Sequence, residues 1–340
     1  MRRLRRHSRQ ANARSLAGVF ILVALTLWLG GCATPPQTRS LSGLPASRLP
    51  PTIELRDVPY FPQDAYQCGP STLAMTMNAA GLDTNPETLT PQVYLPGREG
   101  SLQVEMLSTT RRHGLLAYTL RPQLQDVLAE VAAGHPVLVL QNLAFNWWPR
   151  WHYAVVIGYD LEKRIVILRS GPEPRQQLSL STFEHTWARS GHWAILTLPP
   201  DQIPVTATPE NFLNAALALE QTRQPAAALR AYRSATQRWP DLFAAYIGLG
   251  NTAYQLGDFA AAAAAFRDAT RLQPAAAIAH NNLADTLLRQ NRLDEALTHA
   301  QIAVAVGGDR EPAFAQTLAE IQAQITLRQN RLQPNIKPEP

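Results

Sequence analysis

Cysteine is nearly absent from this chain of 340 residues, which has two copies, Cys32 and Cys68. Acidic residues are missing from the first 31 positions, although six arginines lie there. Long apolar runs are missing too. The most apolar stretch, residues 16–29, is shorter than the roughly 20 residues that a membrane-spanning helix needs. No other run approaches membrane-spanning length, and the first segment differs in charge from the rest.

The formal net charge of +5 comes from that first segment. Six of the 31 lysines and arginines precede Cys32, which leaves 25 basic against 26 acidic residues in the remainder. A protein that binds nucleic acid needs a basic face or stripe, and the sequence contains none. Nucleic acid is therefore excluded as a partner.

Residues 1–31 have the features of a signal peptide, with an arginine-rich start, an apolar stretch and small residues before Cys32. The order Leu29-Gly30-Gly31-Cys32 resembles a lipobox, which implies cleavage before Cys32 and a lipid on that cysteine. The alternative is a short membrane anchor with a chance cysteine, but the apolar stretch is short for a bilayer.

Ala33 stands where aspartate retains many lipoproteins at the inner membrane. By resemblance to that sorting rule, we expect a lipid-anchored protein of the bacterial outer membrane that faces the periplasm. Residues 32–52 are rich in proline, serine and threonine, which predicts a flexible tether. If Cys32 is acylated, Cys68 has no partner for an internal disulfide and is a candidate reactive thiol.

Residues 53–200 mix helical and strand-like patterns. Helices are predicted at residues 70–80, 102–113 (with Ser101 as cap) and 124–133. Strands are predicted at residues 136–143, 153–159, 164–170 and 194–198, with a hairpin turn at 160–163. Helices first and an antiparallel sheet after them indicate an α+β domain.

Residues 208–332, beyond a proline-rich stretch at 199–209, read as helical repeats. Three sets of positions recur every 34 residues: Ala228, Ala262 and Ala296; Tyr232, Phe266 and Ala300; Ala235, Ala269 and Ala303. This pattern resembles the tetratricopeptide repeat, which implies an all-α solenoid with residues 312–332 as its closing helix. The resemblance implies a protein partner for the repeats, and we expect this region to be separable.

Cys68 is predicted to lie at the start of a helix, in the block Gln67-Cys68-Gly69-Pro70. Such a position favours a thiolate and lowers the pKa of the thiol. His152 heads a buried strand and is the candidate general base. Gln63 is the candidate donor to an oxyanion.

These blocks resemble the bacteriocin-processing (double-glycine leader) peptidases. The resemblance covers residues 53–200 and implies a papain-like fold, with Cys68 as nucleophile, His152 as base and Gln63 in the oxyanion hole. The acidic residue that should orient His152 is missing, because Ser170-Gly171-Pro172 stands where Asp-Pro is usual. Ser170 can accept a hydrogen bond but brings no charge. The transporter domains of well-known members are missing as well.

The segment from Phe145 to Trp151 is rich in aromatic residues and has two interpretations, a wall of the cleft or core packing. A second aromatic set is predicted to be core: Phe183, Trp187 and Trp193. Five histidines lack ligand spacing and are predicted to be structural or at the surface: His113, His135, His185, His192 and His299. No metal site and no cofactor are expected.

The sequence thus predicts a cysteine peptidase that cleaves a periplasmic protein or peptide through Cys68 and His152. It is tethered by lipid, and its repeats recruit a protein partner. Two alternatives stay open. One is a cell-wall peptide hydrolase or amidase on the same scaffold. The other is an inactive peptidase fold that serves as an assembly scaffold, which the missing acidic residue favours.

Overall fold

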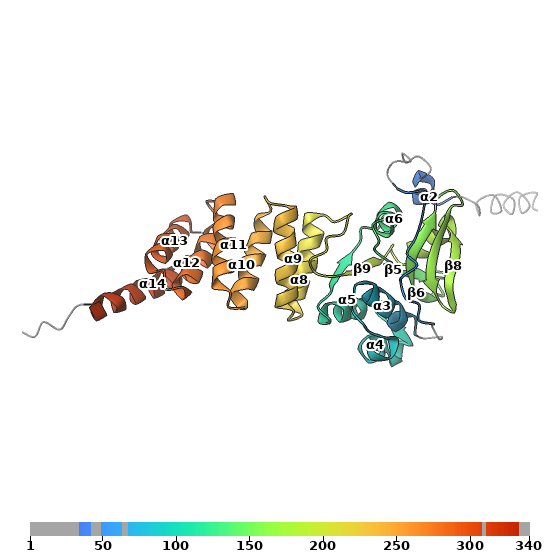
Figure 1. The fold of residues 1–340 in the computed structure, drawn as a ribbon, viewed down its shortest axis with the longest axis horizontal. Helices are drawn as coiled ribbons and strands as arrows, with labels where there is room; N and C mark the ends of the chain where they lie inside the picture. The colour runs from blue at the N-terminus through green and yellow to red at the C-terminus, as the bar shows by residue number, and fades with distance from the viewer. Residues whose placement is uncertain (1–33, 42–48, 63–66, 308–310, 333–340) are drawn as a thin grey trace, which may run out of the picture.

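The computed structural model describes residues 34–41, 49–62, 67–307 and 311–332, which form a sheet-containing part followed by a row of helices (Figure 1). Cys32 and Gln63, with the predicted signal peptide, lie outside the described residues. Among the described residues, no helix is both long and apolar enough to cross a membrane.

A seven-stranded antiparallel sheet forms the centre of the N-terminal part. Its order is β4-β9-β5-β6-β7-β8, and β1 also pairs with β6. The strands are β1 (Thr52–Glu54), β4 (Leu116–Thr119), β5 (Val137–Asn142), β6 (Trp151–Asp160), β7 (Ile165–Ser170), β8 (Glu173–Ser179) and β9 (Ala194–Leu198). A separate hairpin consists of β2 (Tyr94–Leu95) and β3 (Gly100–Ser101).

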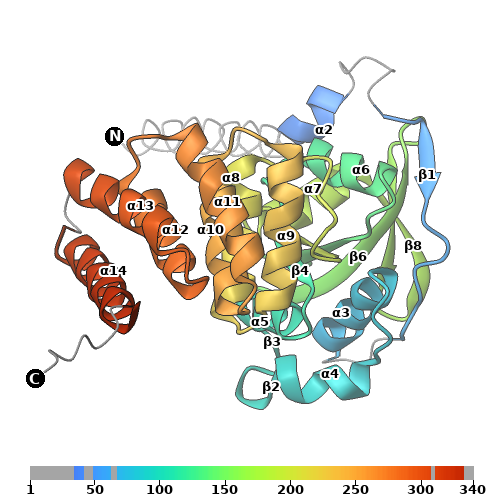
Figure 2. The ribbon, with the colours of Figure 1, turned by 60° about the vertical axis from the view of Figure 1, so that its left-hand side comes forward.

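Helices cover both faces of this sheet (Figure 2). One layer holds α3 (Cys68–Ala79), α4 (Pro86–Val93) and α5 (Gln103–Arg112), and the other holds α6 (Leu124–Ala132) and α7 (Leu180–Ala188). Strand β5 shows the alternation that this requires. Leu138 and Leu140 pack with α3, whereas Val137 and Val139 pack with α6 and α7. The predicted α+β order is confirmed.

Part of the predicted flexible tether is ordered, which corrects the sequence prediction. Helix α2 (Pro36–Leu41) lies against α6 and α7. The buried carboxylate of Glu184 accepts hydrogen bonds from the backbone N–H groups of Gln37 and Thr38 and from the Thr38 hydroxyl. The Gln37 side chain accepts a further bond, from the N–H of Leu124 at 2.5 Å. These partners lie far along the chain, so local composition could not reveal them.

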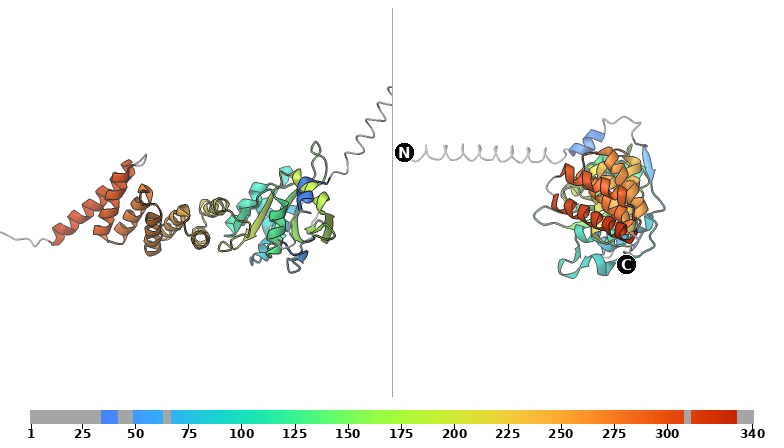
Figure 3. Two further views of the ribbon diagram at one scale, coloured as in Figure 1. Left: turned by 90° about the horizontal axis from the view of Figure 1, so that it is seen from above. Right: turned by 90° about the vertical axis from the view of Figure 1, so that its left-hand side faces the viewer.

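The C-terminal part is a row of seven helices that extends from one end of the sheet part (Figure 3). They are α8 (Pro209–Gln221), α9 (Pro225–Arg238), α10 (Phe243–Gln255), α11 (Phe259–Leu272), α12 (Ala277–Arg289), α13 (Leu293–Val306) and α14 (Glu311–Leu332). All nine positions that recur in the sequence are buried. Gly250 shows why a small residue is needed between helices, because a Cβ there would lie 2.4 Å from the Phe266 ring.

The two parts share one hydrophobic core. Phe212, Ala216 and Leu219 of α8 belong to the same buried cluster as Leu116 and Tyr118 of β4. The linker is fixed as well, because the buried Glu130 carboxylate accepts hydrogen bonds from the backbone N–H and the hydroxyl of Thr206, at 2.7 and 2.6 Å. The first repeat is therefore held by the sheet part.

A fragment of residues 208–332 would lose this support. We expect its α8 and α9 amides to exchange hydrogen much faster than in the full chain, because their shared core is removed. Helices α11–α13 should stay protected, since a second buried cluster, which includes Phe266, Leu283 and Ala300, lies wholly within the repeats. Hydrogen exchange followed by mass spectrometry tests this. Full protection of α8 in the fragment would show that the repeats are independent of the sheet part.

Candidate active site

Cys68 is the first residue of α3. The first backbone hydrogen bond of this helix runs from Ser71 N–H to the Gln67 carbonyl, so the N–H groups before it have no partner within the helix. The backbone N–H groups of Tyr153, Gly69 and Cys68 itself are directed at the Cys68 sulfur. Pro70 lies in the first turn, where a missing N–H costs nothing.

Gly69 fits closely against the neighbouring hairpin. A Cβ at this position would lie 2.2 Å from the Ser101 hydroxyl oxygen, so only glycine allows this approach. The Ser101 hydroxyl is buried and has no hydrogen-bond partner among the residues that the structure describes. Helix α5 begins after it with Leu102 as N-cap. The predicted capping role of Ser101 is therefore wrong. The side chain lies over the first turn of α3 instead.

His152 is the second residue of β6, beside Gln141 of β5. Its Nε2 atom lies 2.9 Å from the Ser170 hydroxyl oxygen, which is buried at the end of β7. The contact with Ser170 engages Nε2, so Nδ1 is the ring nitrogen that is not bound to this hydroxyl. When Ser170 accepts a hydrogen bond from Nε2–H, the neutral ring has its lone pair on Nδ1.

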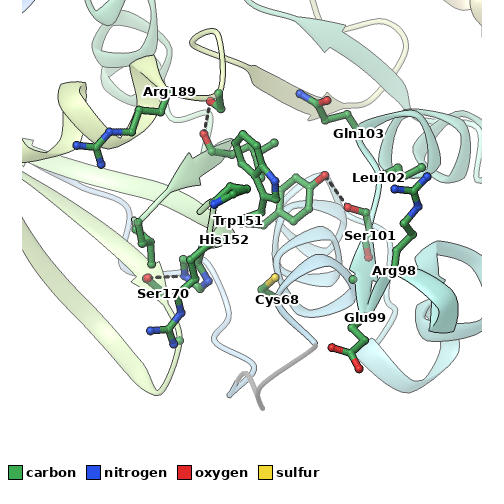
Figure 4. Close-up of a pocket in the computed structure, with 18 of the residues that line it drawn as sticks. Cys68, Arg98, Glu99, Ser101, Leu102, Gln103, Trp151, His152, Ser170 and Arg189 are labelled. Atoms are coloured by element: carbon green, nitrogen blue, oxygen red, sulfur yellow. Dashed lines mark hydrogen bonds between the residues drawn. The ribbon is translucent and has the colours of Figure 1, made fainter. Parts of the chain in front are cut away.

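Cys68, His152 and Ser170 line one cleft with a volume of about 910 Å³ (Figure 4). In this view the Cys68 sulfur projects into the space beside His152. One wall is formed by residues 98–103 and the other by residues 149–153 and 170–173. The structure therefore brings together three of the four predicted catalytic residues, and the fourth, Gln63, lies outside the described residues.

The wall at residues 98–103 was not predicted as part of the site. Residues 98–101 belong to the β2–β3 hairpin, whose turn residue Glu99 has a left-handed backbone with φ 48°, and residues 102–103 begin α5. The Tyr153 hydroxyl joins the two walls by donating a hydrogen bond to the Ser101 carbonyl at 3.1 Å. The dipeptide Pro96-Gly97 was the available turn signal in the sequence.

Comparison with known families identifies both parts of the chain. Residues 55–195 match the family described as Peptidase_C39 like, and residues 213–262 and 247–312 match the tetratricopeptide repeat family. The chain thus contains a Peptidase_C39-like domain followed by tetratricopeptide repeats. The resemblance inferred from the sequence is confirmed. No curated protein matches the chain.

Solved structures include partial matches to each part. A protein described as a C39-like peptidase from Bacillus anthracis is 19% identical, with a TM-score of 0.36, over 43% of this chain and 97% of that chain. The complex of the TPR2B domain of yeast Sti1 with pHsp70 is 17% identical, with a TM-score of 0.33, over 34% and 97%. MamA is 17% identical, with a TM-score of 0.34, over 36% and 71%.

Burial controls the charge state of the pair in the C39-like domain. It raises the pKa of Cys68, and the three N–H groups directed at the sulfur offset this only in part. Burial also lowers the pKa of His152 to about 4, with a smaller contribution from the nearby Arg150 cation. The pair is therefore a neutral thiol and a neutral imidazole at pH 7. The lowered thiol pKa predicted from the helix start is wrong, because loss of solvent outweighs the helix terminus.

No carboxylate among the described residues contributes to the pKa of His152. The described part of the chain also contains no group of three or more His, Cys, Asp or Glu residues that could hold a metal ion. The chemistry that these side chains support by themselves is proton transfer and nucleophilic attack by sulfur.

The other histidines have the contacts of structural or surface residues. His135 lies 2.7 Å from the buried Glu130 carboxylate, His113 contacts Gln92, and His192 contacts Gln37. His299 lies 2.9 Å from His280 between repeat helices, and His185 is exposed. Of the three aromatic residues predicted to be core, Phe183 and Trp187 are completely buried, and Trp193 is partly buried against the α3 cluster.

The close fit at Gly69 gives a packing prediction. Gly69→Ala should destabilise the domain by about 1–3 kcal/mol, the usual cost of overpacking. Ser101→Gly in the same chain should restore most of this loss, because it removes the atoms that the new Cβ meets. Urea unfolding of wild type, both single variants and the double variant measures the coupling. Additive effects of the two changes would contradict the contact.

The buried imidazole gives a pH prediction. His152 binds a proton in the unfolded chain below about pH 6.5 but in the folded chain only below about pH 4. Acid therefore favours the unfolded state between these values, and stability should fall by about 3 kcal/mol as the pH drops through this window. His152→Gln should lose less stability there. The exposed His185→Gln is the matched control, and equal slopes for both variants would contradict the burial of His152.

Proposed function

We propose that this protein is a lipid-anchored cysteine peptidase that hydrolyses peptide bonds of an envelope protein or peptide in the Cys68–His152 cleft. One observation carries the proposal. A cysteine at a helix start and a histidine fixed through Nε2 line the same cleft. The family match supports a peptidase domain with a repeat module.

The first step follows from the neutral state of the pair. Cys68 attacks the substrate carbonyl carbon while His152 Nδ1 accepts the thiol proton, so that charge separates only during the reaction. The backbone N–H of Cys68, at the free end of α3, stabilises the negative oxygen of the tetrahedral intermediate. Gln63, which comes five residues earlier, is proposed as the second donor.

The second step returns the proton. The imidazolium of His152 donates it to the leaving amine as the carbon–nitrogen bond breaks, which leaves a thioester on Cys68. A water molecule, deprotonated by His152, then attacks the thioester and regenerates the thiol. A His152 pKa of about 4 makes the imidazole a weak base but a strong acid, so it favours the proton donation to the amine.

Ser170 positions the ring without stabilising its charge. Its hydroxyl fixes the orientation of the imidazole, and in the proposed reaction it accepts the hydrogen bond from Nε2–H, which leaves the lone pair on Nδ1. A carboxylate at this place would also stabilise the imidazolium, and its lack should limit the rate rather than abolish it. A reduced but measurable rate distinguishes the proposal from the inactive-scaffold alternative, in which Cys68 would form no acyl-enzyme.

The anchor and the repeats complete the proposal. A lipid on Cys32 would lie four residues before α2, which is bound to the peptidase domain through Glu184. The domain would therefore lie close to the membrane, proposed to be the outer membrane on its periplasmic side. The repeats are proposed to bind a protein partner, in the way that tetratricopeptide solenoids present an extended concave surface.

Hydrolysis can be measured with peptides from envelope proteins and mass spectrometry. We expect Cys68→Ala and His152→Ala to lower kcat/KM at least about 10³-fold, as loss of a nucleophile or its base does. Ser170→Ala should lower it about tenfold, since it removes an orienting group without charge. Ser170→Asp should raise the pKa of His152 and move the acid limb of kcat/KM to higher pH.

Iodoacetamide alkylation provides a test without substrate. Because burial raises the pKa of Cys68, its alkylation rate should increase only above the pH at which a free cysteine ionises. A reactive thiol at low pH would contradict the neutral pair. Absence of hydrolysis, together with absence of a thioester on Cys68 with any peptide tested, would favour the inactive scaffold.

A further inference from the structure

The loop between β5 and β6 presents three aromatic rings to solvent. Phe145, Trp147 and Trp148 are 63%, 78% and 70% exposed. Core packing, one of the two interpretations of this segment, is therefore wrong for these residues. Large exposed apolar side chains that lie next to each other indicate a binding surface. We call residues 145–148 the aromatic tip.

The aromatic tip is held in place from below. The buried Asn142 side chain accepts hydrogen bonds from the N–H groups of Ala144 and Arg150, at 3.0 and 2.9 Å, and donates one to the Phe145 carbonyl. The N–H of Trp148 donates to the same carbonyl at 3.1 Å. A loop fixed by a buried side chain keeps its rings exposed in one arrangement, so little entropy is lost when a ligand binds.

The rings form a continuous surface. Phe145 and Trp147 are stacked with their centroids 5.7 Å apart, and Trp148 meets Trp147 edge-on at 6.4 Å. Arg150 follows the tip and is exposed. Such a surface suits aromatic or long aliphatic side chains.

The aromatic tip is continuous with the catalytic cleft. Leu143 on one side of the tip, and Pro149 and Trp151 on the other, line the cleft together with Cys68 and His152. Trp151 is directly bonded to His152 in the chain and is 51% exposed. A peptide that leaves the cleft past His152 would therefore contact these rings. This continuity favours a substrate, rather than an unrelated partner, as the occupant of the aromatic tip.

The direction of the substrate follows from the chemistry. His152 must lie within hydrogen-bond reach of the leaving nitrogen in order to protonate it, whereas the acyl carbon is bonded to Cys68. The chain that follows the scissile bond thus departs on the β6 side, where residues 149–151 lie. The chain that precedes the bond remains on the side of α3 and the hairpin wall.

We propose that the aromatic tip binds apolar side chains on the C-terminal side of the scissile bond and so selects the substrate. This inference rests on the proposed peptidase function. It names a substrate class, peptides with aromatic or aliphatic residues shortly after the cleaved bond, and assigns the selection to Trp147 and Trp148 in particular. Neither tryptophan lines the catalytic cleft, so their removal leaves Cys68 and His152 in place.

The test compares wild type with Trp147→Ser/Trp148→Ser, and with Val205→Ser as the control, an apolar linker residue that is 61% exposed. Each protein is incubated with a tryptic peptide library from bacterial envelope proteins, and cleavage sites are read by mass spectrometry. Wild type and Val205→Ser should cut before apolar residues. The double variant should lose this preference, with kcat/KM for the best wild-type peptide at least about tenfold lower, as for loss of an apolar pocket contact.

Failure of the inference differs from failure of the proposed function. Cleavage by wild type without an apolar preference, or with a preference that the double variant keeps, would overturn the role of the aromatic tip alone. If wild type cleaves nothing, Cys68→Ala is used to capture peptides from the same library. Retention of apolar peptides that depends on Trp147 and Trp148 would support the aromatic tip, and no such retention would overturn it.

A membrane surface is the competing occupant. Vesicles of phosphatidylethanolamine and phosphatidylglycerol are added to Cys68→Ala, and its tryptophan emission is compared with that of the same protein carrying the two serine substitutions. A blue shift that depends on Trp147 and Trp148, with no dependence of peptide cleavage or capture on them, would assign the aromatic tip to the membrane and overturn the proposal.

Discussion

The position of Tyr153 determines the geometry of the cleft. Its ring is buried between α3 and the sheet and meets Trp193 edge-on at 5.8 Å. Its backbone N–H is directed at the Cys68 sulfur, and its hydroxyl bonds the Ser101 carbonyl of the opposite wall. Because His152 is its chain neighbour, one packed residue relates the nucleophile, the base and the hairpin.

The same burial that orders the site sets its charge. An imidazolium and a thiolate in this cleft would both lose solvation, and within the described part of the chain no carboxylate contributes to the pKa of His152. A neutral pair avoids that cost in the resting state. Charge then develops only as the substrate fills the cleft, where N–H groups at the start of α3 are already in place to stabilise it. The proposed peptidase therefore keeps its base in position through Ser170, at the expense of the basicity of His152.

The parts of the fold that were predictable depend on local or repeated patterns. Ala262 and Phe266 recur in phase with their equivalents in other repeats, so their burial followed from spacing alone. Strand β9 was predicted with its observed ends because its apolar run is short and isolated. Cys68 and His152, which motif residues mark in the sequence, line one cleft in the structure.

The errors concern contacts between distant residues. Helix α2 depends on Glu184, which lies 146 positions after Thr38, and nothing near Thr38 indicates that partner. In the sequence Ser101 resembles a helix cap, but its side chain packs on Gly69, which belongs to α3. Strand β8 was missed because its outer residues are polar, as an edge strand allows. The shift in the pKa of Cys68 was predicted in the wrong direction, because the burial that raises it depends on the packing of the whole domain.

The shared core gives the two domains a fixed relation. Helix α8 packs against β4 at one edge of the sheet, and Thr206 is bound to the buried Glu130, so the first repeat cannot swing as on a free linker. Toward the opposite edge of the sheet, β7 and β8 contribute Ser170 and part of one wall of the cleft. The proposed partner, if bound to the first repeat, would therefore lie at a set distance from the cleft. Binding to the repeats raises the local concentration of a substrate at the cleft only when the geometry permits contact with the repeats and the cleft at once. The fixed joint between the two domains sets that geometry.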